Sequence, residues 1–201
     1  MEPQLPFFNP YDTSTESIRK AVGQLFVVGF RGDGESPTPA VTEALGAGDI
    51  GGVILFRRNI RDIEQVVRLN EAIHDAAKSA EAPPFVALDQ EGGRVVRLRE
   101  PLTPIPPMRT IGDTRSWELA ADVAEVLATE VATVGFNLNF SPVLDVDTNP
   151  ANPVIGDRAF SRDPQIVSMM GGAFTFGHLK SGVVPCGKHF PGHGDTDTDS
   201  R

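Results

Sequence analysis

The chain has 201 residues, of which 40% are hydrophobic and 22% charged, a composition typical of a globular protein that buries a sizeable core. Its 18 basic and 27 acidic residues give a formal net charge of −9. This charge argues against nucleic acid or an anionic membrane as the main partner, because both require a basic surface. The single cysteine, Cys186, excludes an internal disulfide framework and fits a reducing compartment. With neither a secretory leader nor a run of roughly 18 apolar residues, the sequence predicts a cytoplasmic protein.

Five short apolar runs have the composition of β-strands, and amphipathic stretches alternate with them. The predicted strands are residues 24–30, 51–56, 84–89, 136–145 and 183–187. The predicted helices are a short one capped by Ser14 or Thr15, one that begins near Asp62, and residues 117–134 and 164–180. The proline-rich residues 101–107 are predicted to form a loop.

Strands that alternate with helices indicate parallel pairing, either in an open doubly wound sheet or in a (β/α)8 barrel. Polar clusters follow four of the strands: Arg57, Arg58 and Asn59; Asp89, Gln90 and Glu91; Asp145, Asp147 and Asn149; Lys188 and His189. A barrel gathers all such loops at one mouth, so this pattern favours the barrel. A complete barrel needs roughly 250 residues. We therefore predict an α/β fold with about the first five βα units of a TIM-type barrel. Residues 1–201 would be the amino-terminal portion of one domain, with 1–21 a leader segment and first helix.

The first chemically informative segment is DQEGGRVVR, residues 89–97, which follows the third predicted strand. Carboxylates accept hydrogen bonds from sugar hydroxyls, and arginine supplies a rigid fork of donors for hydroxyl, amide or carboxylate oxygens. The alternative is an internal salt-bridge network that stiffens the loop. Gly92 and Gly93 do not form a phosphate loop, because neither the GxGxxG spacing nor a Walker lysine is present.

The second segment is NPANPVIGDRAF, residues 149–160, in which the prolines restrict the backbone and present Arg158 from a stiff loop. Arg158 is as well placed in the sequence to pair with Asp157 or Asp145 as to contact a ligand.

The third segment, KHFPGHGDTDTDSR, residues 188–201, carries two histidines, three aspartates and a lysine directly after the fifth predicted strand. A strand that ends in ionisable residues is typical of an active-site loop on an α/β scaffold. The spacing of His189, His193 and the aspartates leaves a zinc site as one alternative and a solvated polar loop as another. A calcium loop would also need a turn glycine and a final glutamate, which are missing. We expect neither a metal nor a cofactor.

Together, these three segments resemble the amino-terminal barrel domain of glycoside hydrolase family 3. DQEGGRVVRL, NPANPVIGDRAF and KHFPGHGDTDTDS occur in the family's order, and the similarity extends from about residue 22 to residue 201. The branch resembled is that of bacterial β-N-acetylhexosaminidases. The resemblance implies a retaining glycosidase that removes terminal β-linked N-acetylhexosamine from small glycans or cell-wall fragments.

The resemblance also implies roles for individual residues. Asp89 would bind sugar hydroxyls in the −1 subsite, together with pocket residues Arg97, Arg158, Lys188 and His189. His193 would have a structural role in the following loop. Asp199 matches the aspartate of the family's Asp-x-His dyad, which orients the histidine that acts as general acid and base.

The sequence departs from the family at Arg201, which stands where this branch has the dyad histidine. Histidine donates and accepts a proton near neutral pH, whereas arginine stays protonated and cannot shuttle one. Asp199 would then form a fixed ion pair. The family's aspartate nucleophile is expected on a later strand, beyond residue 201.

Three interpretations follow from this departure. The chain is a fragment of a full hydrolase, a fragment of a family member weakened in hydrolysis, or a short product that binds sugar or assembles with another chain. We favour the first, with a missing barrel half or a partner chain completing the fold. The alternatives are a β-glucosidase or phosphorolytic enzyme of the same family, a non-catalytic carbohydrate-binding or interaction protein and, more distantly, a metal-dependent hydrolase.

Overall fold

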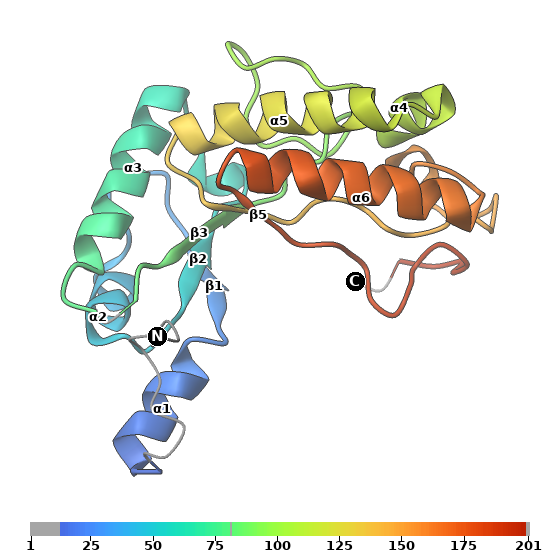
Figure 1. Cartoon of the computed structure of the whole chain (residues 1–201). Helices are drawn as coiled ribbons and strands as arrows, with labels where there is room; N and C mark the ends of the chain where they lie inside the picture. The colour runs from blue at the N-terminus through green and yellow to red at the C-terminus, as the bar shows by residue number, and fades with distance from the viewer. Residues whose placement is uncertain (1–12, 81, 200–201) are drawn as a thin grey trace, which may run out of the picture. The chain divides into compact units, whose positions relative to one another are not determined.

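The computed structural model of the chain describes residues 13–80 and 82–199. Arg201 and most of the predicted leader segment, residues 1–12, lie outside the described residues. The chain divides into two compact units, residues 1–87 and 88–201, and each is described by itself (Figure 1).

The first unit contains the beginning of a parallel sheet and three α-helices. Strand β1 pairs in parallel with β2, and β2 pairs in parallel with residues 85–87 of β3. The elements are α1 (Thr15–Gly23), β1 (Val27–Gly29), α2 (Pro39–Ala47), β2 (Gly52–Ile54), the 3-10 turn η1 (Arg57–Asn59), α3 (Ile63–Ala76) and β3 (Phe85–Leu88), whose last residue belongs to the second unit.

Two helices of this unit begin where the sequence predicts. The Ser14 hydroxyl accepts a hydrogen bond from the Ser17 amide at 3.2 Å, and the Asp62 carboxylate accepts one from the Gln65 amide at 2.7 Å. Each side chain satisfies an amide that has no partner within its helix. Helix α2 was not predicted, because prolines and glycines around it are also typical of loops. Its end is marked by Gly48, whose φ of 72° suits the left-handed helix cap.

The second unit continues the alternation of strands and helices. Strand β4 pairs in parallel with β5, and the Phe140 amide donates to the Leu88 carbonyl oxygen at 2.9 Å. Helices α5 and α6 lie side by side (Figure 1). The elements are α4 (Met108–Thr114), α5 (Trp117–Thr133), β4 (Leu138–Asn139), the 3-10 turn η2 (Gly156–Arg158), α6 (Pro164–Lys180) and β5 (Val184–Pro185).

Small residues allow α5 and α6 to approach closely. A Cβ atom at Gly177 would lie 2.3 Å from the Ala121 carbonyl oxygen, so no larger residue fits there without a shift. Phe160 and Phe174 are fully buried and meet edge to face, with ring centroids 5.8 Å apart. Such packing of small and aromatic side chains anchors α6 in the core of the unit.

The fourth strand is much shorter than predicted. The sequence indicates a strand over residues 136–145, but β4 spans Leu138–Asn139 and is followed only by an isolated bridge between Val143 and Lys188. Pro142 has no amide hydrogen and cannot donate to a neighbouring strand, which ends the regular ladder. Residues 143–147 therefore form a loop, and their side chains do not alternate between two faces as they would in a strand.

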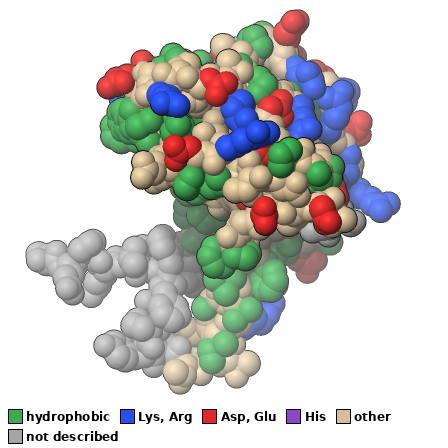
Figure 2. Space-filling view, turned by 90° about the vertical axis from the view of Figure 1, so that its right-hand side faces the viewer, with side chains coloured by type: hydrophobic (Ala, Val, Ile, Leu, Met, Phe, Trp, Pro, Cys, Tyr) green, Lys and Arg blue, Asp and Glu red, His purple; other side chains and the backbone are tan. Residues whose placement is uncertain are grey.

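The parallel strands with intervening helices confirm the predicted α/β class and agree with the predicted partial (β/α)8 barrel. On the face seen in Figure 2, basic and acidic side chains lie interspersed rather than in separate patches. Among the described residues, no helix is long and apolar enough to cross a membrane.

Candidate active site

Asp89 lies directly after β3 and is held by two basic side chains. The Lys188 ammonium group lies 2.9 Å from its Oδ1 atom, and the Arg97 guanidinium group lies 2.9 Å from its Oδ2 atom. The three side chains are 14–23% exposed, so they are shielded but still accessible from solvent. The structure thus brings together three of the predicted pocket residues, of which Lys188 is 99 positions from Asp89 in the sequence.

The surroundings of Asp89 keep its carboxylate ionised. Burial acts to raise the pKa of Asp89, but the charges and hydrogen bonds of Lys188 and Arg97 outweigh burial and lower the pKa below its usual value. The carboxylate therefore accepts hydrogen bonds throughout the neutral range. Acceptance from hydroxyl groups is the chemistry that the predicted role in sugar binding requires.

Glu91 is a second carboxylate next to this group and is almost fully buried, with its side chain 2% exposed. Both of its oxygens bind Arg158, at 2.8 and 2.9 Å, and its Oε1 atom also lies 2.5 Å from the Lys188 ammonium group. Burial acts to lower the pKa of Arg158, but Glu91 outweighs burial and raises it. Arg158 therefore pairs with Glu91 and not with Asp157 or Asp145, the carboxylates that one of the two alternatives named; Asp157 instead lies 3.6 Å from Arg94.

His189 is held by a buried aspartate. Its Nδ1 atom lies 2.5 Å from Asp145 Oδ2, and its Nε2 atom lies 3.4 Å from an Arg158 nitrogen. Burial acts to raise the pKa of Asp145, but hydrogen bonds from the His189 ring and the His193 amide lower it overall. An ionised carboxylate only accepts hydrogen bonds, so Nδ1 of His189 carries the proton that is shared with Asp145.

These contacts connect one continuous charged cluster, in which the 3.4 Å contact between Arg158 and His189 joins the pair of His189 and Asp145 to the other members: Asp89, Glu91, Arg97 and Lys188. Its three carboxylates balance its three permanently basic side chains when the histidine is neutral. The cluster offers fixed guanidinium and ammonium donors beside carboxylate acceptors, a combination suited to a polar, uncharged ligand with hydroxyl and amide groups.

Local sequence explains how the loop after β3 presents Arg97. The Gln90 side-chain oxygen accepts hydrogen bonds from the amides of Arg97 and Leu98, at 2.8 and 3.1 Å. Gly92 has φ +106°, and a Cβ atom there would lie 2.7 Å from the Pro106 carbonyl oxygen. The glycine thus permits a turn that packs against the proline-rich loop, and Gln90 closes that turn beneath Arg97.

A buried polar chain supports this loop from α6. Asn139 exchanges hydrogen bonds with the Gln90 backbone, at 2.8 and 3.0 Å, and its amide nitrogen lies 3.0 Å from His178 Nε2. The other His178 ring nitrogen lies 2.9 Å from the Phe174 carbonyl oxygen. Burial lowers the pKa of His178 to about 4, so the ring is neutral at pH 7, with Nδ1 as donor and Nε2 as acceptor.

The segment after His189 is docked onto the loop that follows β4. The Asn152 amide nitrogen donates to the His193 carbonyl oxygen at 2.6 Å, and the Asn149 amide nitrogen donates to the Thr196 carbonyl oxygen at 3.1 Å. A Cβ atom at Gly194 would lie 1.7 Å from the Val146 carbonyl oxygen, so the two backbones touch. The prolines and asparagines of residues 149–153 therefore shape a cradle for residues 193–196.

The two remaining residues of the third segment with predicted roles, His193 and Asp199, are not members of the charged cluster. The ring of His193 lies 2.8 Å from the Thr196 hydroxyl, which agrees with a structural position in the loop. Asp199 is exposed, and its predicted dyad partner position, Arg201, is outside the described residues.

Sequence reasoning did not assign Glu91, Asp145, Asn149 or Asn152 to the site. A usable signal was present for the first two residues. Glu91 stands two positions after Asp89, and Asp145 is the last residue of the fourth predicted strand. For the two asparagines the signal was weaker, since asparagine beside proline is also common in ordinary turns.

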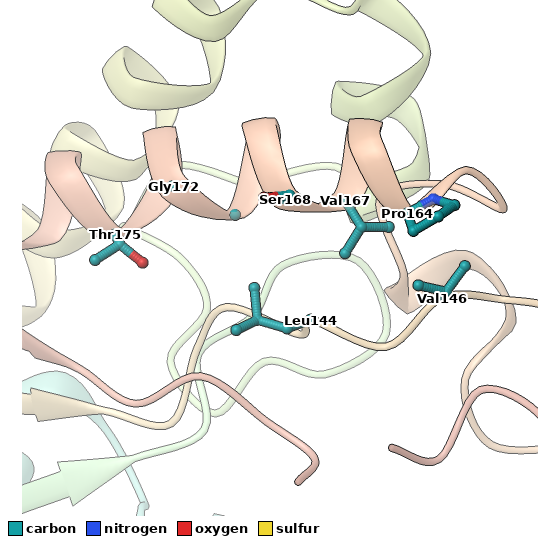
Figure 3. A pocket seen from close by; sticks show the side chains of 8 residues that line it. Leu144, Val146, Pro164, Val167, Ser168, Gly172 and Thr175 are labelled. Atoms are coloured by element: carbon teal, nitrogen blue, oxygen red, sulfur yellow. The ribbon is translucent and has the colours of Figure 1, made fainter. Parts of the chain in front are cut away.

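An apolar hollow of about 420 Å³ lies between α6 and residues 144–146. Leu144 and Val167 point toward one another across it (Figure 3). Apart from the hydroxyl groups of Ser168 and Thr175, its lining side chains are apolar. It therefore lacks the charged donors and acceptors of the charged cluster and does not match a sugar site.

The histidines of the third segment do not form a recognisable metal site in the described part of the chain. No group of three His, Cys, Asp or Glu side chains there is arranged to hold a metal ion. The ring centroids of His189 and His193 are 5.9 Å apart. Both ring nitrogens of His189 contact protein groups, and Nδ1 of His193 lies 2.8 Å from the Thr196 hydroxyl.

Comparisons with known proteins give one consistent result. Residues 17–201 match the model of the glycosyl hydrolase family 3 N terminal domain. A β-hexosaminidase of Thiobacillus denitrificans is 48% identical over 158 residues, which cover 76% of this chain and 43% of that protein. The chain thus spans less than half the length of this curated relative.

Two solved structures are also similar. A family 3 β-N-acetylglucosaminidase of a Paenibacillus species has a TM-score of 0.84 and 36% identity, over 91% of this chain and 35% of that one. NagZ of Neisseria gonorrhoeae, solved with N-trifluoroacetyl-D-glucosamine, has a TM-score of 0.76 and 38% identity, over 87% of this chain and 52% of that one.

Proposed function

Because the chain belongs to glycosyl hydrolase family 3, we propose that the protein is a glycosidase that removes terminal β-linked N-acetylhexosamine from small glycans. The observation that carries this proposal is the charged cluster, in which Lys188 and Arg97 hold the ionised Asp89 at the ends of β3 and β5. The names of the relatives support the N-acetylhexosamine specificity. Cell-wall fragments in the cytoplasm are the proposed setting, and a reduced Cys186 fits that compartment.

In the proposed complex, Asp89 accepts hydrogen bonds from sugar hydroxyl groups. Arg97, Arg158 and Lys188 donate to the oxygens of the same sugar, and His189 adds a further polar contact. The ion pairs within the cluster restrict the movement of these long side chains before the ligand arrives, which lowers the entropy cost of binding. Water released from the cluster would be replaced by hydroxyl groups of matching polarity.

The proposed chemistry is a two-step retaining displacement through a covalent glycosyl-enzyme. Asp199 belongs to the part of the site that supplies the general acid and base. In this proposal the 201 residues form the sugar-binding portion of one barrel domain, and further chain or a partner supplies the nucleophile.

A second candidate is a carbohydrate-binding protein that does not hydrolyse its ligand. The observation that favours it is the identity of Arg201, two positions after Asp199. Arginine remains protonated at any accessible pH, so it cannot replace a histidine that donates and accepts a proton.

The experiment compares two chromogenic substrates with the protein expressed from the full reading frame. The proposed function predicts turnover of an N-acetyl-β-glucosaminide and much slower turnover of the β-glucoside. Turnover of the β-glucoside alone would assign a different specificity. Binding of N-acetylglucosamine without turnover of either substrate would contradict the glycosidase and support the binding protein.

A further inference from the structure

Asp145 connects two parts of the candidate site through a single carboxylate. Its side chain has no exposed surface. One oxygen lies 2.5 Å from the His189 ring nitrogen Nδ1, and the other accepts a hydrogen bond from the His193 backbone amide at 2.6 Å. The same group therefore contacts a side chain of the charged cluster and the backbone of the following loop.

Both partners of Asp145 are hydrogen-bond donors. The His193 amide always donates, and the ring nitrogen of His189 donates to a carboxylate that is ionised. Only a side chain with two acceptor oxygens satisfies both partners at these positions. Asparagine has the same shape but one acceptor, so its amide hydrogens would face one of the two donors.

The contact with Asp145 also determines what His189 presents to the cluster. With the proton on Nδ1, the Nε2 atom of the neutral ring carries a lone pair. That atom lies 3.4 Å from a nitrogen of Arg158, which has only hydrogens to offer. A ring with its proton on Nε2 would instead direct an N–H group at the guanidinium group, which is unfavourable.

The backbone contact anchors the turn between the two histidines. Phe190, Pro191 and Gly192 are exposed, and Phe190 as a residue is 99% exposed. The Asp145 carboxylate binds the chain on both sides of this turn. Without this carboxylate, neither the orientation of the His189 ring nor the position of the start of segment 193–196 would be fixed.

We propose that Asp145 is a positioning residue of the sugar site. It holds His189 as the Nδ1-protonated tautomer, with Nε2 as an acceptor, and fixes the turn that follows. This inference rests on the proposed function, because it assigns a role within the proposed sugar site. It goes beyond that function in naming a residue that acts on the ligand through another side chain.

The first test measures the tautomer directly in the wild-type protein. Long-range proton–nitrogen spectra are recorded at a pH of about 8, where an unperturbed imidazole is neutral. The chain has four histidines, and the His189 signals are assigned as those lost in His189→Gln. We expect His189 to have its proton on Nδ1, whereas a proton on Nε2 would overturn the proposal whether or not any sugar binds.

The second test compares Asp145→Asn with Asp147→Asn. Asp147 lies two residues away, is 5% exposed and pairs with Arg109 at 2.8 Å, so its variant also loses a buried ion pair. We expect Asp145→Asn to shift His189 toward a tautomer mixture and to weaken N-acetylglucosamine binding at least roughly tenfold. The Asp147→Asn variant should keep the wild-type tautomer and affinity.

Two results would contradict the positioning role of Asp145 without contradicting the proposed function. One is a wild-type affinity and His189 tautomer in Asp145→Asn, and the other is an equal loss of affinity in Asp147→Asn. A wild-type protein that does not bind N-acetylglucosamine would instead count against the proposed function. The tautomer measurement would still decide the role of Asp145 in that case.

Discussion

Glu91 binds Arg158 through both carboxylate oxygens, at 2.8 and 2.9 Å. The two residues are 67 positions apart in the sequence, and their pairing joins the loop after β3 to the 3-10 turn η2. Glu91 also contacts Lys188, so one buried carboxylate holds two basic side chains of the charged cluster. The bidentate geometry uses the fixed fork of arginine, which lysine cannot reproduce.

The first prediction concerns Glu91→Gln. The variant keeps the size of the side chain but removes its charge, and an amide group then faces one of two buried basic groups. Breaking a buried pair by changing one partner costs about 3 kcal/mol of unfolding free energy. Chemical denaturation of wild type and variant measures this difference.

The matched control for Glu91 is Asp157→Asn. Asp157 is next to Arg158 in the chain, but its side chain is half exposed and lies 3.6 Å from Arg94. Exposed pairs contribute at most about 1 kcal/mol, so this variant should unfold almost like wild type. Equal unfolding free energies of the two variants would show that the pair of Glu91 and Arg158 does not stabilise the fold more than an exposed ion pair does.

The second prediction is an acid-dependent loss of stability that originates at His178. Burial lowers its pKa from 6.5 to about 4 in the folded protein, so the unfolded chain binds a proton at higher pH than the folded one. The contribution of neutral His178 to the free energy of unfolding is fully present above pH 6.5. It decreases as the pH falls from 6.5 to about 4 and changes no further below that. The full change is about 3 kcal/mol.

Unfolding free energies measured across this pH range test the prediction with two variants. His178→Gln removes the titrating group and should flatten the decrease, although it also lowers stability at neutral pH. His74→Gln, on α3, is the control substitution, because it changes a partly buried histidine that is not part of the contact between Asn139 and His178. An undiminished decrease in His178→Gln would assign the acid sensitivity to other groups.

The third prediction concerns the cradle for residues 193–196. Asn152 donates to the His193 carbonyl oxygen at 2.6 Å while its own oxygen accepts from the amides of Val154 and Ile155 at 2.8 Å. Asn152→Asp preserves the acceptor but places a second oxygen against the His193 carbonyl. We expect faster amide hydrogen exchange in residues 193–196.

The control for Asn152 introduces the same charge at an exposed position. Gln165→Glu lies at the start of α6, where a carboxylate is tolerated by the helix dipole. Its exchange rates in residues 193–196 should equal those of wild type. Unchanged rates in Asn152→Asp would mean that the cradle does not hold this segment.

Much of the fold could be predicted because its signals are local. Asp62 marks the start of α3 through a contact with an amide three residues away, and the positions of the five strands follow from short apolar runs. The length of β4 could not be predicted from apolar character alone. Pro142 interrupts the ladder there, and hydrophobicity does not report the missing hydrogen-bond donor.

The candidate site was predictable in part for a different reason. Asp89 and Lys188 were expected to meet because parallel strands bring their carboxyl ends to one edge. The partner of Arg158 was not predictable, since several carboxylates were equally available in the sequence and the choice depends on tertiary packing. The buried contact between Asn139 and His178 likewise leaves no local pattern.

The most direct test of the account is calorimetric titration of N-acetylglucosamine into the protein from the full reading frame, comparing wild type with Asp89→Ala. Loss of an ionised hydrogen-bond acceptor should weaken binding about 100-fold, while the fold is retained because Lys188 keeps its contact with Glu91. Asp113→Ala, at an exposed position on α4, should bind like wild type. Equal affinities of wild type and Asp89→Ala would contradict the assignment of the sugar site to the charged cluster.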